Sequence, residues 1–104
     1  MRYRYYDLHH QQAGTTVTAR LEGSVCNLIL LDAVNFKRYR AGQPFLYTGG
    51  RQWQSPVSLE VPEDGHWYAV VDLGGYKGRV KATVEVRSAD ESRAVETPRS
   101  LVLS

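Results

Sequence analysis

Residues 79–87 read RVKATVEVR and form the most regular stretch of the chain. Apolar and polar residues alternate along it without interruption. Successive side chains of a β-strand leave opposite faces of the sheet. The alternation therefore predicts an antiparallel strand that buries one face and exposes the other. The residues expected to face inward are Val80, Ala82, Val84 and Val86.

Other strand candidates surround this stretch. Two more segments alternate in the same way, and two are apolar on both faces, which is typical of central strands covered on both sides. Two shorter segments complete the set, and turns rich in glycine separate the strands. We predict an all-β fold, an antiparallel β-sandwich of jelly-roll type with about seven or eight strands. The segments are TTVTARLEG (15–23), SPVSLEVP (55–62), VCNLILL (25–31), WYAVV (67–71), RYRYYDL (2–8) and PFLYTG (44–49).

One segment, NFKRYRAG at residues 35–42, departs from the β pattern. Asn35 can cap a first helical turn, Phe36 and Tyr39 lie three residues apart on one side, and Gly42 can end the helix. We predict a short helix at residues 35–41. We also expect a β-sandwich domain at residues 1–87, followed at 88–104 by a polar C-terminal tail, ordered at most where LVL (101–103) docks on a sheet edge.

Composition restricts the class of protein. The chain has 104 residues, enough for one domain, and a formal net charge of +2. So small an excess of positive charge does not indicate a nucleic-acid or membrane partner. Cys26 is the only cysteine, lies in an apolar run and is expected to be a buried, inert thiol. MRYRYYDLHH at the N-terminus lacks the apolar core of a signal peptide, so we expect a soluble, cytoplasmic protein.

The residue types that carry catalysis or bind metals do not gather along the sequence. His9 and His10 are adjacent and should point to opposite faces of a strand, and His66 is distant from both. A zinc site needs three or four ligands. No serine has the spacing of a nucleophile elbow. We therefore expect no catalytic residue, no metal and no cofactor.

Two further motifs have structural explanations. The loop GGYKG (Gly74–Gly78) precedes a strand instead of a helix, so we interpret it as a turn and not as a phosphate site. Asp7, Asp32 and Asp72 each follow an apolar or aromatic pair, and we expect each to mark a strand end. Strict alternation of strand direction would place Asp7 and Asp32 at one end of the sandwich and Asp72 at the other.

Aromatic and basic residues supply the candidates for ligand binding. RYRYY and FKRYR interleave cations with tyrosine, a combination that suits stacking on bases or sugars. Alternation also allows the tyrosines of RYRYY to be core residues. We expect Trp67 to be a core anchor and Trp53 to be the more exposed ring. The ligand-binding candidates are Trp53, His66, Tyr76, Lys77, Lys37, Arg38 and Arg40.

These residues also resemble a known family. YYDL, then LLDAVNFKRYRAGQPFLYTGG, then SPVSLEVPEDGHWYAVVDLGGYKGRVKATV are similar to the bacterial domain-of-unknown-function family numbered eighteen eighty-three. The resemblance covers about residues 1–86. It implies a small all-β bacterial domain of a kind found alone or fused to Toll/interleukin-receptor domains. No activity is established for such domains, so the resemblance supplies no catalytic residues.

We therefore expect a non-catalytic binding or interaction module whose ligand is a protein or a small molecule such as a carbohydrate. One alternative is a small enzyme with a site near His66, Asp72 and the Gly74–Gly78 loop. Another alternative is nucleic-acid or carbohydrate binding through an exposed surface of arginine, tyrosine and tryptophan. We expect no membrane partner.

Overall fold

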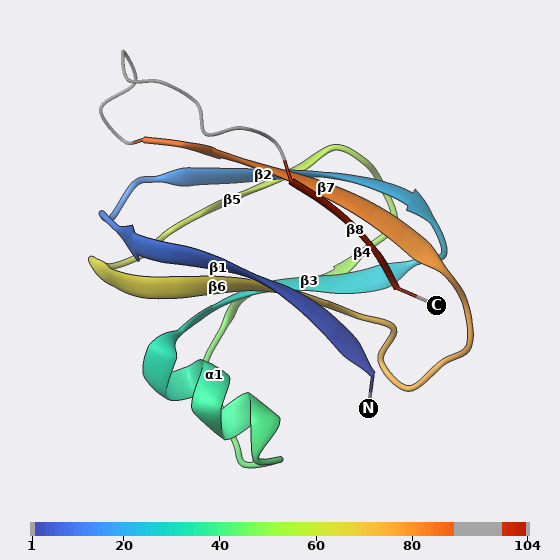
Figure 1. Cartoon of the computed structure of the whole chain (residues 1–104), viewed down its shortest axis with the longest axis horizontal. Helices are drawn as coiled ribbons and strands as arrows, with labels where there is room; N and C mark the ends of the chain where they lie inside the picture. Colours follow the sequence, from blue (N-terminus) through green and yellow to red (C-terminus); the bar gives the residue numbers. More distant parts are fainter. Residues whose placement is uncertain (1, 89–98, 104) are drawn as a thin grey trace.

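The computed structural model describes residues 2–88 and 99–103, which form two four-stranded antiparallel sheets packed face to face (Figure 1). The first sheet has the order β1-β6-β3-β4 and the second has the order β5-β2-β7-β8. One helix, α1, lies on the outer face of the first sheet (Figure 1). The predicted all-β sandwich is confirmed. The elements are β1 (Tyr3–Gln11), β2 (Thr16–Gly23), β3 (Cys26–Asp32), α1 (Ala33–Arg40), β4 (Thr48–Gln52), β5 (Val57–Glu60), β6 (Gly65–Asp72), β7 (Val80–Arg87) and β8 (Arg99–Leu103).

The alternating stretch at residues 79–87 forms β7, and all four of its predicted inward residues are buried. Together with side chains from β1, β2, β3 and β6 they make the core between the sheets. Each fully buried aliphatic side chain in such a core contributes about 1.5–3 kcal/mol relative to an exposed one. Trp67 is part of this core at 6% exposure, and its indole N–H donates to the Glu63 carbonyl at 2.8 Å.

The two segments that are apolar on both faces form β3 and β6, which lie at the centre of the first sheet. Leu28 and Leu30 of β3 point into the core between the sheets. Ile29 and Leu31 point the other way and pack with Phe36 of α1. The prediction of strands covered on both faces is therefore confirmed, and the helix is what covers the outer face.

The helix begins earlier than predicted. Asp32, not Asn35, is the N-cap, and its Oδ1 accepts from the Asn35 backbone N–H at 2.9 Å. A carboxylate at the end of β3 satisfies a free N–H of the first helical turn, which lets α1 start directly after the strand. The predicted end is correct, because Ala41 is the C-cap and Gly42 follows with a φ of +73°.

The predicted strand at residues 44–49 is mostly wrong, because β4 begins only at Thr48. Pro44 has no N–H to give to a sheet. The Leu46 N–H donates to Asn35 Oδ1 at 2.8 Å, so this segment is held against the helix. The displaced segment leaves Leu46 and Tyr47 exposed and forms one wall of the cavity described below.

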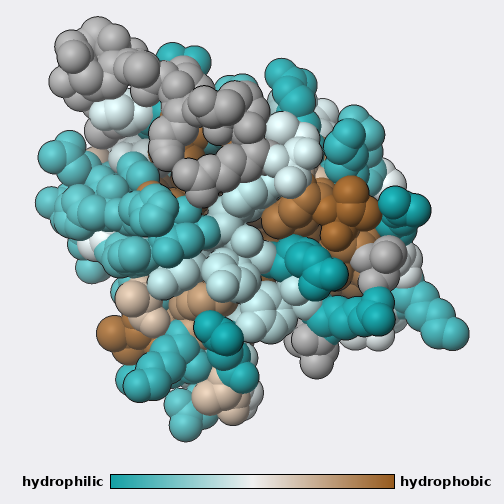
Figure 2. All heavy atoms as spheres, in the orientation of Figure 1, coloured by the Kyte–Doolittle hydropathy of each residue, from teal (hydrophilic) through white to brown (hydrophobic). Residues whose placement is uncertain are grey.

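At the C-terminal end, β8 pairs antiparallel with β7 at the edge of the second sheet, and Leu103 is fully buried. The expected docking of LVL on a sheet edge is confirmed, whereas residues 89–98 of the predicted tail lie outside the described residues. Figure 2 shows a mainly hydrophilic face on which hydrophobic side chains gather in the region of β7 and β8. Within the described ranges, no helix has the length and apolarity needed to span a membrane.

Candidate functional site

A cavity of about 500 Å³ lies on the outer face of the first sheet, beside α1 and the segment that follows it. This volume is within the range of about 300–1,000 Å³ that is usual for small-molecule sites. Aromatic rings make much of the wall, and Asp72 is the acidic residue among the described residues that line it. The ring-bearing residues are Tyr3, Tyr39, Phe45 and Tyr47. The polar residues are Asn27, Arg40, Gln43 and Asp72.

Asp72 is the last residue of β6 and is only 3% exposed. Its Oδ1 accepts from Asn27 Nδ2 at 2.7 Å and from the Gly74 backbone N–H at 2.9 Å. Its Oδ2 accepts from the Tyr39 hydroxyl at 2.7 Å. Within the described ranges, no lysine, arginine or histidine forms a salt bridge with Asp72. Three hydrogen bonds from neutral groups therefore hold this buried carboxyl group in place.

Tyr39 fixes the direction of one of these bonds. Burial, followed by the hydrogen bond to Asp72 and the charge of that residue, raises the pKa of Tyr39 above its ordinary value. The phenol therefore keeps its proton and donates a hydrogen bond to Asp72. The sequence pattern placed Tyr39 on one side of the helix with Phe36 and within the FKRYR motif, without linking it to Asp72. Tyr39 connects α1 to the end of β6 through this bond.

The aromatic wall continues from Tyr39 in both directions. The Tyr39 ring meets Tyr3 and Phe45 edge-on, each at a centroid distance of 5.2 Å. Phe45 in turn lies 5.5 Å from Tyr47. Edge-to-face pairs such as the two made by Tyr39 add about 0.5–1.5 kcal/mol beyond the area they bury. The rings therefore support one another and present an ordered apolar surface to the cavity.

The cavity is lined by hydrogen-bonding groups beside its aromatic wall. An ionised carboxyl group has about four acceptor sites. Asp72 uses two on Oδ1 and one on Oδ2, so Oδ2 can still accept a bond from a ligand N–H or O–H. The described residues that line the cavity include no serine, cysteine, histidine or lysine. The lining is suited to holding a molecule with a flat apolar face and a hydrogen-bond donor.

Of the binding candidates predicted from sequence, Arg40 lines this cavity. Lys37 and Arg38 are exposed in the last turn of α1, and Lys77 is exposed in the glycine loop. Trp53 and Tyr76 are 72% and 69% exposed, and they lie elsewhere. The Arg51 guanidinium lies 5.5 Å from each of these two rings.

The Gly74–Gly78 loop is the turn that was predicted, with φ of +63° at Gly74 and +86° at Gly75. Of the three hydrogen bonds to Asp72 described above, this loop supplies one, from the Gly74 backbone N–H. His66 lies at the other end of β6 from Asp72, about 20 Å away at 3.3 Å per strand residue. The two residues therefore do not form the common site that the enzyme alternative requires.

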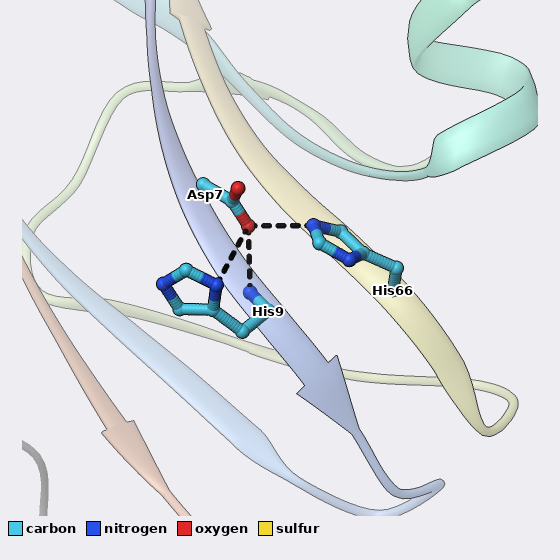
Figure 3. A group of neighbouring side chains, drawn as sticks. All are labelled: Asp7, His9 and His66. Carbon is cyan, nitrogen blue, oxygen red and sulfur yellow. Dashed lines mark hydrogen bonds and ion pairs between the residues drawn. The ribbon is translucent and has the colours of Figure 1, made fainter.

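His66 belongs to a second cluster, with Asp7 and His9 (Figure 3). Asp7 Oδ1 lies 2.7 Å from His66 Nε2 and 3.5 Å from His9 Nδ1. It also accepts from the His9 backbone N–H at 2.8 Å. The expectation that His66 stands alone is wrong, because β1 and β6 are neighbouring strands and bring it close to His9. Asp7 does not mark a strand end either, since β1 continues past it to Gln11.

Burial raises the pKa of Asp7, but the hydrogen bonds from His9 and His66 and the charges of both rings outweigh it. The net effect is a pKa below the ordinary value. Asp32 and Asp72 do mark strand ends, as predicted. The pairing of Asp32 with Trp67 puts Asp32 toward the end of the first sheet opposite Asp72, whereas Asp7 pairs with Tyr68 near the middle of β6.

Comparison with known proteins identifies a family whose function is unknown. The family described as "Domain of unknown function (DUF1883)" matches residues 1–90, which include β1 to β7 and α1. No curated protein and no solved structure matches the chain. The family match covers most of the chain and contains both the cavity and the Asp7 cluster. The chain therefore belongs to the DUF1883 family of domains of unknown function.

Proposed function

We propose that this protein is a non-catalytic binding module that holds a small carbohydrate in the cavity beside α1. The observation that carries the proposal is the position of Asp72, a buried carboxyl group in the lining of a cavity with aromatic walls. Three neighbours fix this group in place, and one acceptor site on Oδ2 remains for a ligand. A preorganised acceptor of this kind favours binding because little has to be ordered when the ligand arrives.

A sugar ring matches both features of the cavity. Its hydroxyl groups can donate to Asp72, and its C–H face can pack on aromatic rings such as those of Tyr39 and Phe45. Arg40 and Gln43 supply donors, and Asn27 adds an amide whose Nδ2 is already bound to Asp72. Small-molecule sites commonly combine a mostly apolar lining with a few polar groups that set orientation.

The test is a titration of the isotope-labelled protein with a panel of neutral monosaccharides and disaccharides, followed by NMR. We expect at least one sugar to shift the backbone amide signals of Gly42, Gly50 and Gly74 in a saturable manner. Asp72→Asn should weaken that binding by about tenfold or more, since a hydrogen bond to a charged group contributes about 1.5–3 kcal/mol. Trp53→Ala, which removes an exposed ring outside the cavity, should leave the affinity unchanged.

Two outcomes would contradict the proposal. In the first, no sugar of the panel shifts these signals. In the second, Trp53→Ala abolishes binding whereas Asp72→Asn does not, which would move the site to the exposed rings. Tetramethylammonium serves as a separate probe, because a carboxylate beside aromatic rings also suits a cation. If this ion binds in a saturable manner and no sugar binds, the ligand of the cavity is a cation and not a carbohydrate.

A second candidate is binding of single-stranded nucleic acid at the surface formed by Arg51, Trp53 and Tyr76. The observation in its favour is that the guanidinium of Arg51 lies beside two exposed rings. Exposed rings next to a cation suit base stacking and phosphate contact. Binding to a fluorescent single-stranded DNA should then weaken steeply as salt increases. Absence of DNA binding at low salt would rule out nucleic-acid binding at this surface.

A further inference from the structure

Asp7, His9 and His66 form a cluster of potential metal ligands (Figure 3). These residues do not belong to the described lining of the cavity. Asp7 and His9 belong to β1, and His66 belongs to the neighbouring strand β6. Their neighbours Leu8 and Trp67 are in the core between the sheets. The cluster therefore occupies the outer face of the first sheet, where the side chains of His9, Asp7 and His66 are 68%, 37% and 41% exposed.

A β-bulge brings His9 into the cluster. The register between β1 and β6 shifts between Asp7 and His9, and His9 has a φ of +61°. Positive φ is uncommon for a residue other than glycine, and within the described part of the chain His9 is the one such residue. Bulges of this type re-aim side chains and are frequent next to functional sites. Here the bulge turns both the N–H and the ring of His9 toward Asp7.

The ligand atoms are close to the separations that a metal ion requires. Asp7 Oδ1, His9 Nδ1 and His66 Nε2 all lie within 4.8 Å of one another. Tetrahedral ligands at bond lengths of about 2.05 Å are about 3.3 Å apart. A metal site here requires side-chain rotations that bring these atoms closer to that arrangement while the two strands stay in place. The oxygen–nitrogen distances of 2.7 Å and 3.5 Å already bracket this separation.

We propose that Asp7, His9 and His66 bind a divalent transition-metal ion such as Zn²⁺, with at least one coordination position open to solvent. Imidazole and carboxylate are the ligand types that suit such ions. Three protein ligands leave a fourth position for water or an outside ligand, as in open zinc sites. The exposure of His9 makes that position accessible from solvent.

The experiment is a titration of the metal-free full chain with zinc chloride, followed by calorimetry and by NMR of the histidine rings. We expect one ion per chain and shifts of the His9 and His66 ring signals, with His10 unaffected. His10 is the matched control, because it adjoins His9 in sequence and is absent from the cluster. The variant His10→Gln should therefore bind zinc with the affinity of the wild type.

Three single variants test the ligands while keeping the local backbone. Asp7→Asn retains an acceptor for the His9 N–H, His9→Asn places a residue that tolerates positive φ, and His66→Gln changes an exposed side chain. Loss of a residue that only hydrogen-bonds to a metal ligand weakens metal binding by roughly 10–100-fold. Each of these variants removes a ligand itself, so each should weaken zinc binding by more than that. The proposal fails if the wild type does not bind zinc at millimolar concentration. It also fails if His10→Gln weakens binding as much as His9→Asn does.

Discussion

The Tyr39 hydroxyl donates to Asp72 Oδ2 at 2.7 Å and so connects the only described helix to the end of a central strand. α1 is short, half of its eight residues are polar or charged, and Phe36 is its buried residue. Such a helix is stable mainly through its tertiary contacts. The bond from Tyr39 therefore fixes the position of α1 and, with it, one wall of the cavity.

Tyr39→Phe should lower the free energy of unfolding by about 1–3 kcal/mol, because Asp72 would lose one of its donors while staying buried. The ring contacts with Tyr3 and Phe45 would remain, so the change isolates the hydroxyl group. Urea denaturation measures the effect. Tyr76→Phe is the control, since that ring is 69% exposed and should change stability very little. Equal midpoints for wild type and Tyr39→Phe would show that the bond contributes nothing to stability.

Trp67→Ala should cost about 3–5 kcal/mol, the usual range for removal of a large aromatic residue from a core. Trp67 packs between the sheets, and its indole N–H is bound to the Glu63 carbonyl. Trp53→Ala is the matched control, because Trp53 is 72% exposed and its described partner is the Arg51 guanidinium. It should cost no more than about 1 kcal/mol, the value of an exposed cation–π contact. Thermal melting of both variants decides whether the two tryptophans differ as described.

Much of the fold could be predicted because burial on one or both faces is visible in the spacing of apolar residues. The alternation at residues 79–87 and the apolar runs of β3 and β6 identify half-buried and central strands without further information. The first residue of α1 was missed because Asp32 both ends a strand and caps a helix. The strand at residues 44–49 was misplaced because the Leu46 N–H is taken by a distant side chain, Asn35.

The sites were harder to predict because each joins residues far apart in sequence. Asn27, Tyr39 and Asp72 come from three different elements, and the pairing of β3 with β6 brings two of them together. The aspartate after an apolar strand was a usable signal for Asp72, although it was interpreted only as a strand end. For His9 the pattern gave no signal, because the register shift that turns its ring toward Asp7 is a tertiary property of β1 and β6.

Glycine substitutions should separate backbone strain from steric conflict. Gly75 has a φ of +86°, and the space that a Cβ would occupy there is open, so Gly75→Ala should cost about 1–2 kcal/mol from conformation alone. At Gly49 the φ is +109°, and an added Cβ would lie only 2.3 Å from the Leu28 carbonyl oxygen. Gly49→Ala should therefore destabilise the protein more, because β4 must move away from β3. Chemical denaturation of both variants should give the lower midpoint for Gly49→Ala, and the reverse order would contradict the pairing of β3 with β4.

Cys26 should be unreactive until the protein unfolds. Its side chain is 3% exposed, and burial together with the charge of Asp72 raises the pKa of the thiol from its ordinary value of 9.0. Because the thiolate is the reactive form, both its accessibility and its population are low near neutral pH. Ellman's reagent at pH near 8 should label the native protein slowly and the urea-unfolded protein at once. Asp72→Asn removes the charge but not the burial, so native Cys26 should remain protected in that variant. Rapid labelling of the native wild type would show that the start of β3 is open to solvent and would contradict the packing of Cys26 in the core.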